Sequence, residues 1–152
     1  MIELDPANAE EYIQNTADYI ERLAELDAAF REVVDNAVRR TVVFADRFPF
    51  RYFMDAYGLE YFAAFPGCST DTEPSVQTVA FLIDKIRDEN IPVVFHIELS
   101  NERMADTISE ETGATKLLLH SAHNVTRDDF QNGETYLSLM TRNVEALREA
   151  LH

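Results

Sequence analysis

Two hydrophobic patterns follow one another along the chain. From Asp5 to about Val38, apolar residues recur at spacings of three and four, which is the period of one face of an α-helix. Asp5 is placed to cap this helix and Pro6 suits its first turn, and neither a glycine nor an interior proline interrupts it. A helix of that length spans roughly 45–50 Å. The first pattern therefore predicts a long leading helix whose length is set by something larger than one small domain.

Short apolar runs replace the helical period after residue 38. The expected strands are Thr41–Asp46, Tyr61–Phe65, Val93–Glu98 and Lys116–His120. The expected helices are Arg51–Tyr57, Ser75–Glu89, Asn101–Thr112 and Thr135–Leu151, with Gly58 and Gly113 as helix C-caps. Continuous apolar strands that alternate with helices are typical of a parallel sheet covered on both faces. We expect an α/β fold with a four-stranded parallel sheet flanked by helices, divided into the long helix (1–38) and an α/β lobe (39–152).

Composition narrows the classes of function. The chain has 152 residues, 46% of them apolar, which suits one domain with a proper core. Its formal net charge is −15 and its acidic residues are spread along the chain, so a nucleic-acid or anionic-membrane partner is excluded for want of a basic surface. No apolar run approaches the roughly 20 residues of a membrane helix, and no signal peptide opens the chain. With a single cysteine, Cys68, neither an internal disulfide nor a CxxC metal site is possible.

Polar residues stand at the carboxyl ends of three expected strands. Asp46 ends the first, His96 and Glu98 end the third, and His120 ends the fourth with His123 close behind. Ligands bind beyond this edge of open parallel sheets. Because His96 and Glu98 are two apart on a strand, their side chains are expected on the same face, near His120. Imidazole and carboxylate groups are zinc ligands, so these five residues are candidate metal ligands.

Each candidate also has a structural interpretation. A histidine at a strand end often serves only as a hydrogen-bonded structural residue, and Glu98 is equally placed to cap the helix that begins near Asn101. Asp46 and its neighbour Arg47 form either part of a site or a simple ion pair. The loop after the second strand offers three further donors, Cys68, Asp71 and Glu73. The cysteine is either a soft metal ligand or an inert thiol.

Five segments, taken in order, resemble one protein family over nearly the whole chain. They are "DPANAEEYIQNTADYIERLAELDAAF", "FPFRYFMDAYGLEY", "EPSVQTVAFLIDKIRDENIPVVFHIE", "MADTISEETGATKLLLHS" and "GETYLSLMTRNVEALREAL". The family is that of the metal-binding substrate-binding proteins of ABC transporters, the zinc- and manganese-type group that includes lipoproteins and cell adhesins. Such a protein has two lobes joined by a long helix, and this chain resembles the C-terminal lobe with most of that helix.

The resemblance implies partners and a location. The N-terminal lobe would be missing from this chain, and the parent protein would deliver a divalent metal ion to an ABC transporter permease. The parent protein would lie outside the cytoplasm, in the periplasm or anchored by a lipid at the cell surface. A lobe without its partner exposes its helix and its cleft face, so we expect a homodimer through one of these surfaces.

The resemblance also assigns the candidate ligands. In this family two metal ligands come from each lobe. At the first ligand position of the C-terminal lobe this chain has Arg47, which cannot bind a cation. Asp46 lies beside it as an alternative donor. At the second ligand position this chain has His120, where manganese-type members carry aspartate. The change from an oxygen to a nitrogen donor favours Zn²⁺, with Mn²⁺ as the alternative. Glu98 matches a glutamate that is not usually a direct ligand, and His123 is either a second donor or a partner behind the first.

We therefore expect a metal-capture module and not an enzyme. In the isolated lobe, an empty site is an equally open outcome. One alternative is a zinc-dependent hydrolase in which Glu98 is the base, although the chain has no HExxH motif. The other alternative is an interaction domain that binds no ligand and whose histidines are structural.

Overall fold

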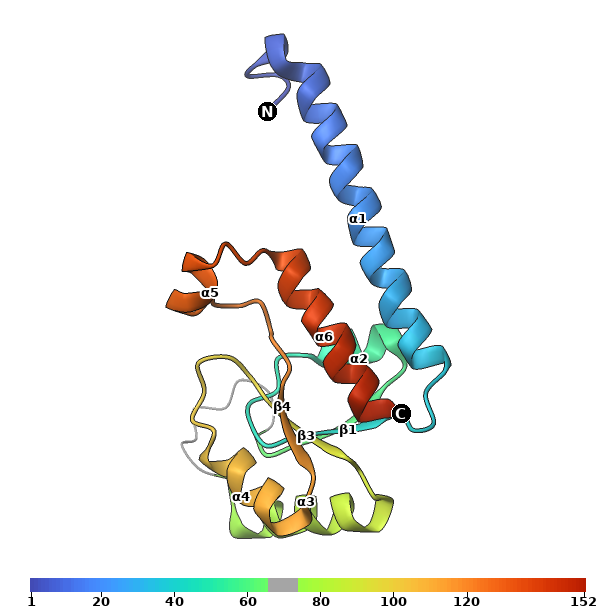
Figure 1. Ribbon diagram of the computed structural model, residues 1–152, viewed down its shortest axis with the longest axis vertical. Helices are drawn as coiled ribbons and strands as arrows, with labels where there is room; N and C mark the ends of the chain where they lie inside the picture. The colour runs from blue at the N-terminus through green and yellow to red at the C-terminus, as the bar shows by residue number, and fades with distance from the viewer. Residues whose placement is uncertain (66–73) are drawn as a thin grey trace.

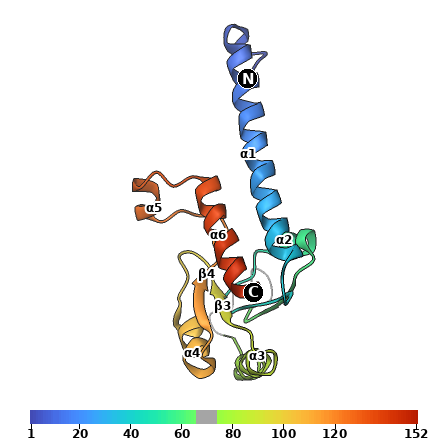
Figure 2. The same ribbon diagram turned by 45° about the vertical axis from the view of Figure 1, so that its right-hand side comes forward.

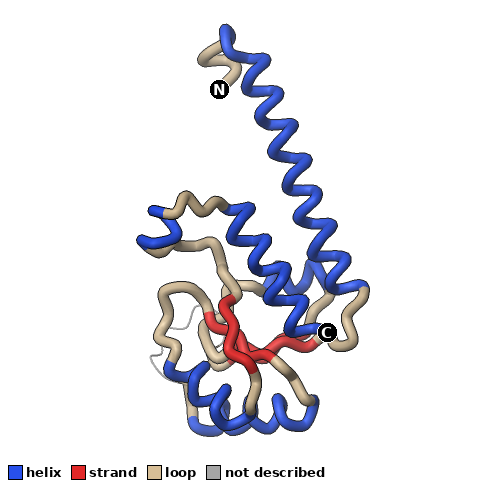
Figure 3. The backbone as a smooth tube through the Cα atoms, in the orientation of Figure 1, coloured by secondary structure: helices blue, strands red, loops and turns tan. Residues whose placement is uncertain are grey.

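The computed structural model describes residues 1–65 and 74–152 (Figure 1). Figure 3 shows how helices alternate with short strands along this part of the chain. The strands are β1 (Thr41–Phe44), β2 (Glu60–Ala63), β3 (Val93–His96) and β4 (Thr115–Leu118). The helices are α1 (Ala9–Asp35), which follows a 3-10 turn at Pro6–Asn8, and α2 (Arg51–Tyr57), α3 (Val76–Glu89), α4 (Arg103–Thr112), α5 (Arg127–Gln131) and α6 (Tyr136–Leu151).

The four strands form one parallel sheet in the order β2-β1-β3-β4. In the centre, Val43 of β1 lies opposite Phe62 of β2 and Val94 of β3. At the β4 edge, Leu117 lies opposite Phe95. Because all four strands run the same way, their carboxyl ends meet at one rim of the sheet, where ligands bind in such folds. The predicted parallel α/β fold is confirmed.

Helices cover both faces of the sheet (Figures 1 and 2). Successive strand residues point to opposite faces, so Phe44 packs on the side of α6 and Val43 on the side of α3 and α4. The first cluster is rich in aromatic residues and contains Phe30, Phe44, Phe95, Met54 and Leu147 among others. The second is mainly aliphatic and contains Val43, Val94, Leu82, Ile86 and Ile108 among others. The two cores fix the sheet between helical layers and so hold its rim in place.

Helix α1 is only partly packed on this body. Its C-terminal part lies along α6 and buries Phe30, Val33 and Val34. Its N-terminal half projects away from the sheet (Figure 2), and the side chains of Ile13 and Ile20 are 58% and 60% exposed. No helix within residues 1–65 and 74–152 is both long and apolar enough to cross a lipid bilayer.

Strands and helices differ from the predicted bounds mainly at the rim. All four strands end two residues earlier than predicted. The side-chain carboxylate of Asp46 accepts the backbone N–H of Ile97. In a longer β3 this N–H would pair with a neighbouring strand, so the side chain replaces a strand hydrogen bond. Gly58 and Gly113 close α2 and α4 in the left-handed conformation, as the sequence predicts.

The short helix α5 is absent from the sequence prediction. It spans only five residues, which is too few to produce a recognisable hydrophobic period. A local cap supports it, because the hydroxyl of Thr126 accepts the backbone N–H of Asp129 at 3.0 Å. Helix α5 follows the segment that contains His120 and His123 and precedes α6.

Candidate metal site at the sheet rim

Asp46 connects the ends of the two central strands. Its carboxylate is buried, and it accepts the backbone N–H of Arg47 at 2.7 Å and that of Ile97 at 3.2 Å. Arg47 follows β1 and Ile97 follows β3, so one side chain joins both strand ends. These two hydrogen bonds give Asp46 a structural role in the free lobe, whether or not it also contacts a cation.

Glu98 organises the segment that follows β4. One carboxylate oxygen accepts the backbone N–H of Ser121 at 2.8 Å, and the other accepts the Ser121 hydroxyl and, at 3.5 Å, the backbone N–H of Asn124. Burial alone would raise the pKa of Glu98, but the hydrogen bonds from Ser121 outweigh it and hold the pKa below its ordinary value. Glu98 is therefore a carboxylate at neutral pH, although its side chain is only 3% exposed.

Hydrogen bonds fix both the backbone and the ring of His120. Asn143 of α6 accepts the His120 backbone N–H at 2.8 Å and donates to the His120 carbonyl at 2.7 Å. The ring atom Nδ1 accepts the backbone N–H of Ala122 at 2.9 Å and lies 3.9 Å from a carboxylate oxygen of Glu98. The other ring nitrogen, Nε2, is buried and has no hydrogen-bond partner within the described part of the chain. An unpartnered buried nitrogen requires an explanation.

His96 lies apart from Glu98. Its ring is near the Ile97 carbonyl at 3.3 Å and near the Glu102 carboxylate at 4.0 Å. Glu102 is in turn bonded to Lys116, 2.7 Å away. The expectation that His96 and Glu98 share a strand face is wrong, because β3 ends at His96 and Glu98 belongs to the turn that follows. His96 is thus part of a polar group beside α4.

His123 is exposed and lines the same cavity as Glu98. A cavity of about 290 Å³ is lined by Arg47, Glu98, Ser121 and His123 among others. A second cavity of about 300 Å³ is lined by Asp46 among others. Arg47 is exposed and belongs to both cavities. The remaining predicted donors, Cys68, Asp71 and Glu73, lie outside the described residues.

The structure thus brings some candidates together and separates others. Glu98 and His120 are adjacent, His123 shares a cavity with Glu98, and Asp46 is joined to the residue before Glu98. Within residues 1–65 and 74–152, no three histidine, cysteine, aspartate or glutamate side chains lie close enough to form a metal site by themselves. Among the described residues, Glu98 and His120 are therefore the candidate donors that lie side by side at the rim.

Three residues that matter at the rim were missed by the sequence analysis. Ser121 and Ala122 act through a local turn, which apolar patterning does not report. Asn143 gives a detectable signal, because it falls in the apolar stripe of the last helix between Met140 and Leu147. A polar residue at such a position is expected to have a specific buried partner, and here that partner is the backbone of His120.

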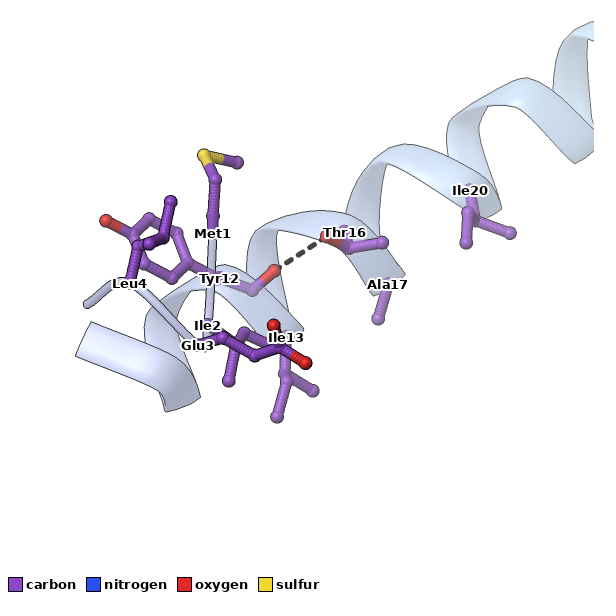
Figure 4. Close-up of a pocket in the computed structure, with 9 residues that line it drawn as sticks. All are labelled: Met1, Ile2, Glu3, Leu4, Tyr12, Ile13, Thr16, Ala17 and Ile20. Atoms are coloured by element: carbon purple, nitrogen blue, oxygen red, sulfur yellow. Dashed lines mark hydrogen bonds between the residues drawn. The ribbon is translucent and has the colours of Figure 1, made fainter. Parts of the chain in front are cut away.

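A larger cavity lies far along the chain from the rim residues. It measures about 770 Å³ and is formed by the first four residues and one face of the N-terminal half of α1 (Figure 4). Ile13 and Ile20 lie along this face, and the Thr16 hydroxyl is turned back to the Tyr12 carbonyl at 2.7 Å. The lining is mostly apolar and offers no set of metal donors. This cavity is therefore a candidate contact surface and not a cation site.

The sequence of this chain is similar to those of known proteins. The chain is 28% identical over 151 residues to the high-affinity zinc uptake system protein ZnuA of Bacillus subtilis, covering 99% of this chain and 47% of that protein. It is 32% identical over 144 residues to the zinc-binding lipoprotein AdcA of Streptococcus pneumoniae, covering 95% of this chain and 28% of that protein. This chain therefore spans half or less of the length of these relatives.

Solved structures show the same fold. The metal-dependent lipoprotein YcdH from Bacillus subtilis matches with a TM-score of 0.82 at 28% identity, over 99% of this chain and 56% of that one. The family model that matches is described as zinc-uptake complex component A periplasmic, ZnuA, and it covers residues 1–150. Because that match takes in nearly every residue, this chain belongs to the ZnuA family of zinc-uptake components.

Proposed function

We propose that this chain is the C-terminal lobe of a substrate-binding protein that captures zinc for an ABC uptake transporter. Family membership supports the class of function. The observation that carries the proposal is the pairing of His120 with Glu98 at the carboxyl rim, 3.9 Å apart and both nearly inaccessible to solvent. A histidine backed by a carboxylate is a common arrangement behind a zinc ligand.

In this proposal His120 supplies the main cation donor of the lobe. Glu98 fixes the segment around it, and Asp46 joins the strand ends that support Glu98. His123 lines the cavity beside Glu98 and would act as a second donor or as a partner of the first. An imidazole donor favours zinc over manganese, which prefers oxygen ligands. His96, beside Glu102, remains a structural residue on this view.

The proposed mechanism is closure of two lobes around the ion. In this proposal a second lobe supplies the donors that join His120 around the ion. Closure about a long helix that spans both lobes would complete the shell and bury the ion. The permease then takes the ion from the closed protein. The protein would act outside the cytoplasm, in keeping with the words periplasmic and lipoprotein in the descriptions of its family and relatives.

The second lobe is also the proposed occupant of the apolar cavity on α1. The cavity lies on the half of the helix that projects beyond the α/β body (Figure 4). Exposed apolar residues that gather on one face usually mark an interface. The long helix would then be packed on both lobes, which limits their relative motion. A chain that carries this surface uncovered is expected to self-associate.

Calorimetric titration with zinc chloride tests the function. We expect weak binding by the lobe alone, and His120→Ala is expected to lower the affinity at least about tenfold, because a lost direct ligand costs more than a lost outer partner. The control is His152→Ala, whose ring lies beside the Val33 carbonyl at the end of the chain. Equal affinities for the wild type and His120→Ala would remove His120 from the site.

A further inference from the structure

The two ring nitrogens of His120 are both unavailable to a cation in the conformation observed. Nδ1 accepts the Ala122 backbone N–H at 2.9 Å, so its lone pair is already used. A neutral imidazole with an accepting Nδ1 carries its proton on Nε2. Nε2 is buried and has no partner within the described part of the chain. A metal needs a nitrogen with a free lone pair, and His120 does not offer one in this conformation.

Glu98 is placed to favour the other tautomer of the same ring. One of its carboxylate oxygens is 3.9 Å from His120 Nδ1, which is too long for a hydrogen bond but requires only a small movement to become one. In metal sites a ligating histidine usually donates its second N–H to a carboxylate or a carbonyl. If Nδ1 carried the proton and donated to Glu98, Nε2 would have a free lone pair.

The turn that blocks this tautomer is strained. Ala122 has a φ angle of 57°, in the left-handed region that disfavours residues with a Cβ atom. In this turn its N–H donates to His120 Nδ1 at 2.9 Å. The turn is held in place by the contacts that Glu98 makes with Ser121 and Asn124. The same carboxylate therefore stabilises the closed turn and is the nearest acceptor for the alternative tautomer.

We propose that Glu98 is a positioning residue that switches the tautomer of His120 when the cation arrives. This inference rests on the proposed zinc-capture function. In the free lobe the Ala122 N–H occupies Nδ1 and the proton sits on Nε2. On binding, the Ala122 turn moves away, Nδ1 takes a proton from solvent water and donates to Glu98, and Nε2 gives its proton to solvent water and binds the ion. The ring stays neutral and its number of protons is unchanged.

Histidine-ring NMR of the full chain tests this switch directly. Long-range proton–nitrogen correlations of the ¹⁵N-labelled protein distinguish the two neutral tautomers and metal-bound nitrogen. Without zinc, we expect His120 to show protonated Nε2 and unprotonated Nδ1. With zinc chloride, we expect protonated Nδ1 and metal-bound Nε2. A free protein with protonated Nδ1, or binding through Nδ1, would overturn the inference.

The same spectra separate failure of the switch from failure of the proposed function. If zinc changes no histidine ring and titration calorimetry shows no binding, the zinc-capture function itself is wrong. If zinc binds while His120 keeps its proton on Nε2, the capture function stands on other donors and the tautomer switch is wrong. The rings of His96, His123 and His152 are assigned by their individual loss in three His→Gln variants.

Two substitutions test the parts of the switch separately. Glu98→Gln keeps one oxygen acceptor but removes the charge, and we expect it to weaken zinc binding by about 10- to 100-fold. Ala122→Gly makes the left-handed turn easier to hold, so we expect it to favour the closed state and lower zinc affinity several-fold.

Asn90→Gly is the matched control for the second substitution. Asn90 also has a positive φ angle, 50°, but it caps the C-terminus of α3 and belongs to neither rim cavity. We expect its zinc affinity to equal that of the wild type. A residue with a purely structural role at position 122 would leave the zinc affinity unchanged in Ala122→Gly as well. Unchanged or stronger binding by that variant would contradict the switch.

Discussion

Asn143 shows how one side chain holds the candidate ligand in place. It is the only polar residue among the buried positions of α6, and its amide satisfies both the backbone N–H and the carbonyl of His120. These backbone groups come just after β4 ends, where no strand neighbour is left to pair with them. A buried amide with two matched partners connects the last helix to the site and explains why the apolar stripe of that helix is interrupted.

We therefore expect Asn143→Ala to lower the free energy of unfolding by about 2–4 kcal/mol, because two buried backbone groups lose their partners. Urea denaturation followed by circular dichroism measures this change. The control is Asn36→Ala, since Asn36 is exposed and donates only to the Glu32 carbonyl at the end of α1. That variant is expected to lose less than about 0.5 kcal/mol. Equal losses in the two variants would show that the His120 contacts contribute little.

Glu98 gives the fold a dependence on acidic pH. Its pKa in the folded protein lies below the ordinary value of 4.5, because the hydrogen bonds from Ser121 outweigh the opposing effect of burial. A carboxylate with a lowered pKa adds stability that is fully present above the unfolded pKa and is lost as pH falls through the folded pKa. We expect the wild type to lose more stability than Glu98→Gln between about pH 5 and pH 3. Parallel urea-denaturation curves over that range would contradict this assignment.

The two halves of helix α1 lie in different environments, one buried and one exposed. Its C-terminal part contributes Phe30 to the aromatic core, where the ring lies 5.1 Å from that of Phe53. Its N-terminal half carries exposed isoleucines and one wall of the 770 Å³ cavity. Apolar periodicity is continuous through both halves, so the sequence predicts the helix but does not show which half has a partner within this chain. Only the arrangement of the other elements reveals that difference.

The exposed half of α1 leads to a prediction about association. We expect the wild-type chain to have a mass above its 17.4 kDa monomer at high protein concentration, because the apolar face of Ile13 and Ile20 is uncovered. The double variant Ile13→Lys, Ile20→Lys should be monomeric and keep the wild-type stability. Light scattering after size-exclusion chromatography measures the mass. The control is Val76→Lys on α3, which is 86% exposed; a monomeric wild type would rule out association through α1.

At the scale of the whole molecule, apolar runs and helix caps were enough to predict the fold. The runs around Val43, Val94 and Leu117 gave the parallel strands, and Gly58 and Gly113 marked the ends of two helices correctly. The details of the rim were not available from the pattern. At the rim, hydrogen bonds to side chains replace the pairing between strands. The alternation of side chains along a strand, from which His96 was predicted to lie beside Glu98, therefore stops at His96, the last residue of β3.

The site itself was only partly predictable for a related reason. The sequence placed Asp46, Glu98 and His120 at one rim because parallel strands end together. It gave no sign of the left-handed Ala122 or of the hydrogen bond that this residue makes to the His120 ring. Such turns depend on a few local contacts and not on a repeating pattern of residues. The hydrogen bonding of the His120 ring is therefore visible only in the structure and not from its position in the chain.

The overall charge determines how the whole molecule should respond to salt. The chain has 28 acidic and 13 basic residues, so carboxylates outnumber basic side chains even where Lys116 pairs with both Glu102 and Asp106. Repulsion among these charges destabilises the folded state and is screened as the Debye length falls from ~30 Å at 0.01 M to ~8 Å at 0.15 M salt. We expect the melting temperature to rise by a few degrees over that range.

Magnesium chloride separates this general effect from specific capture of zinc. Magnesium screens carboxylates as zinc does, but it prefers oxygen ligands and has little affinity for an imidazole donor such as His120. Thermal unfolding at low salt should therefore show a small rise with millimolar magnesium and an additional rise with zinc that His120→Ala removes. A melting temperature that falls with sodium chloride would mean that the ion pairs outweigh the repulsion. An equal response to both metals would mean that zinc acts on the surface charge and not at the rim.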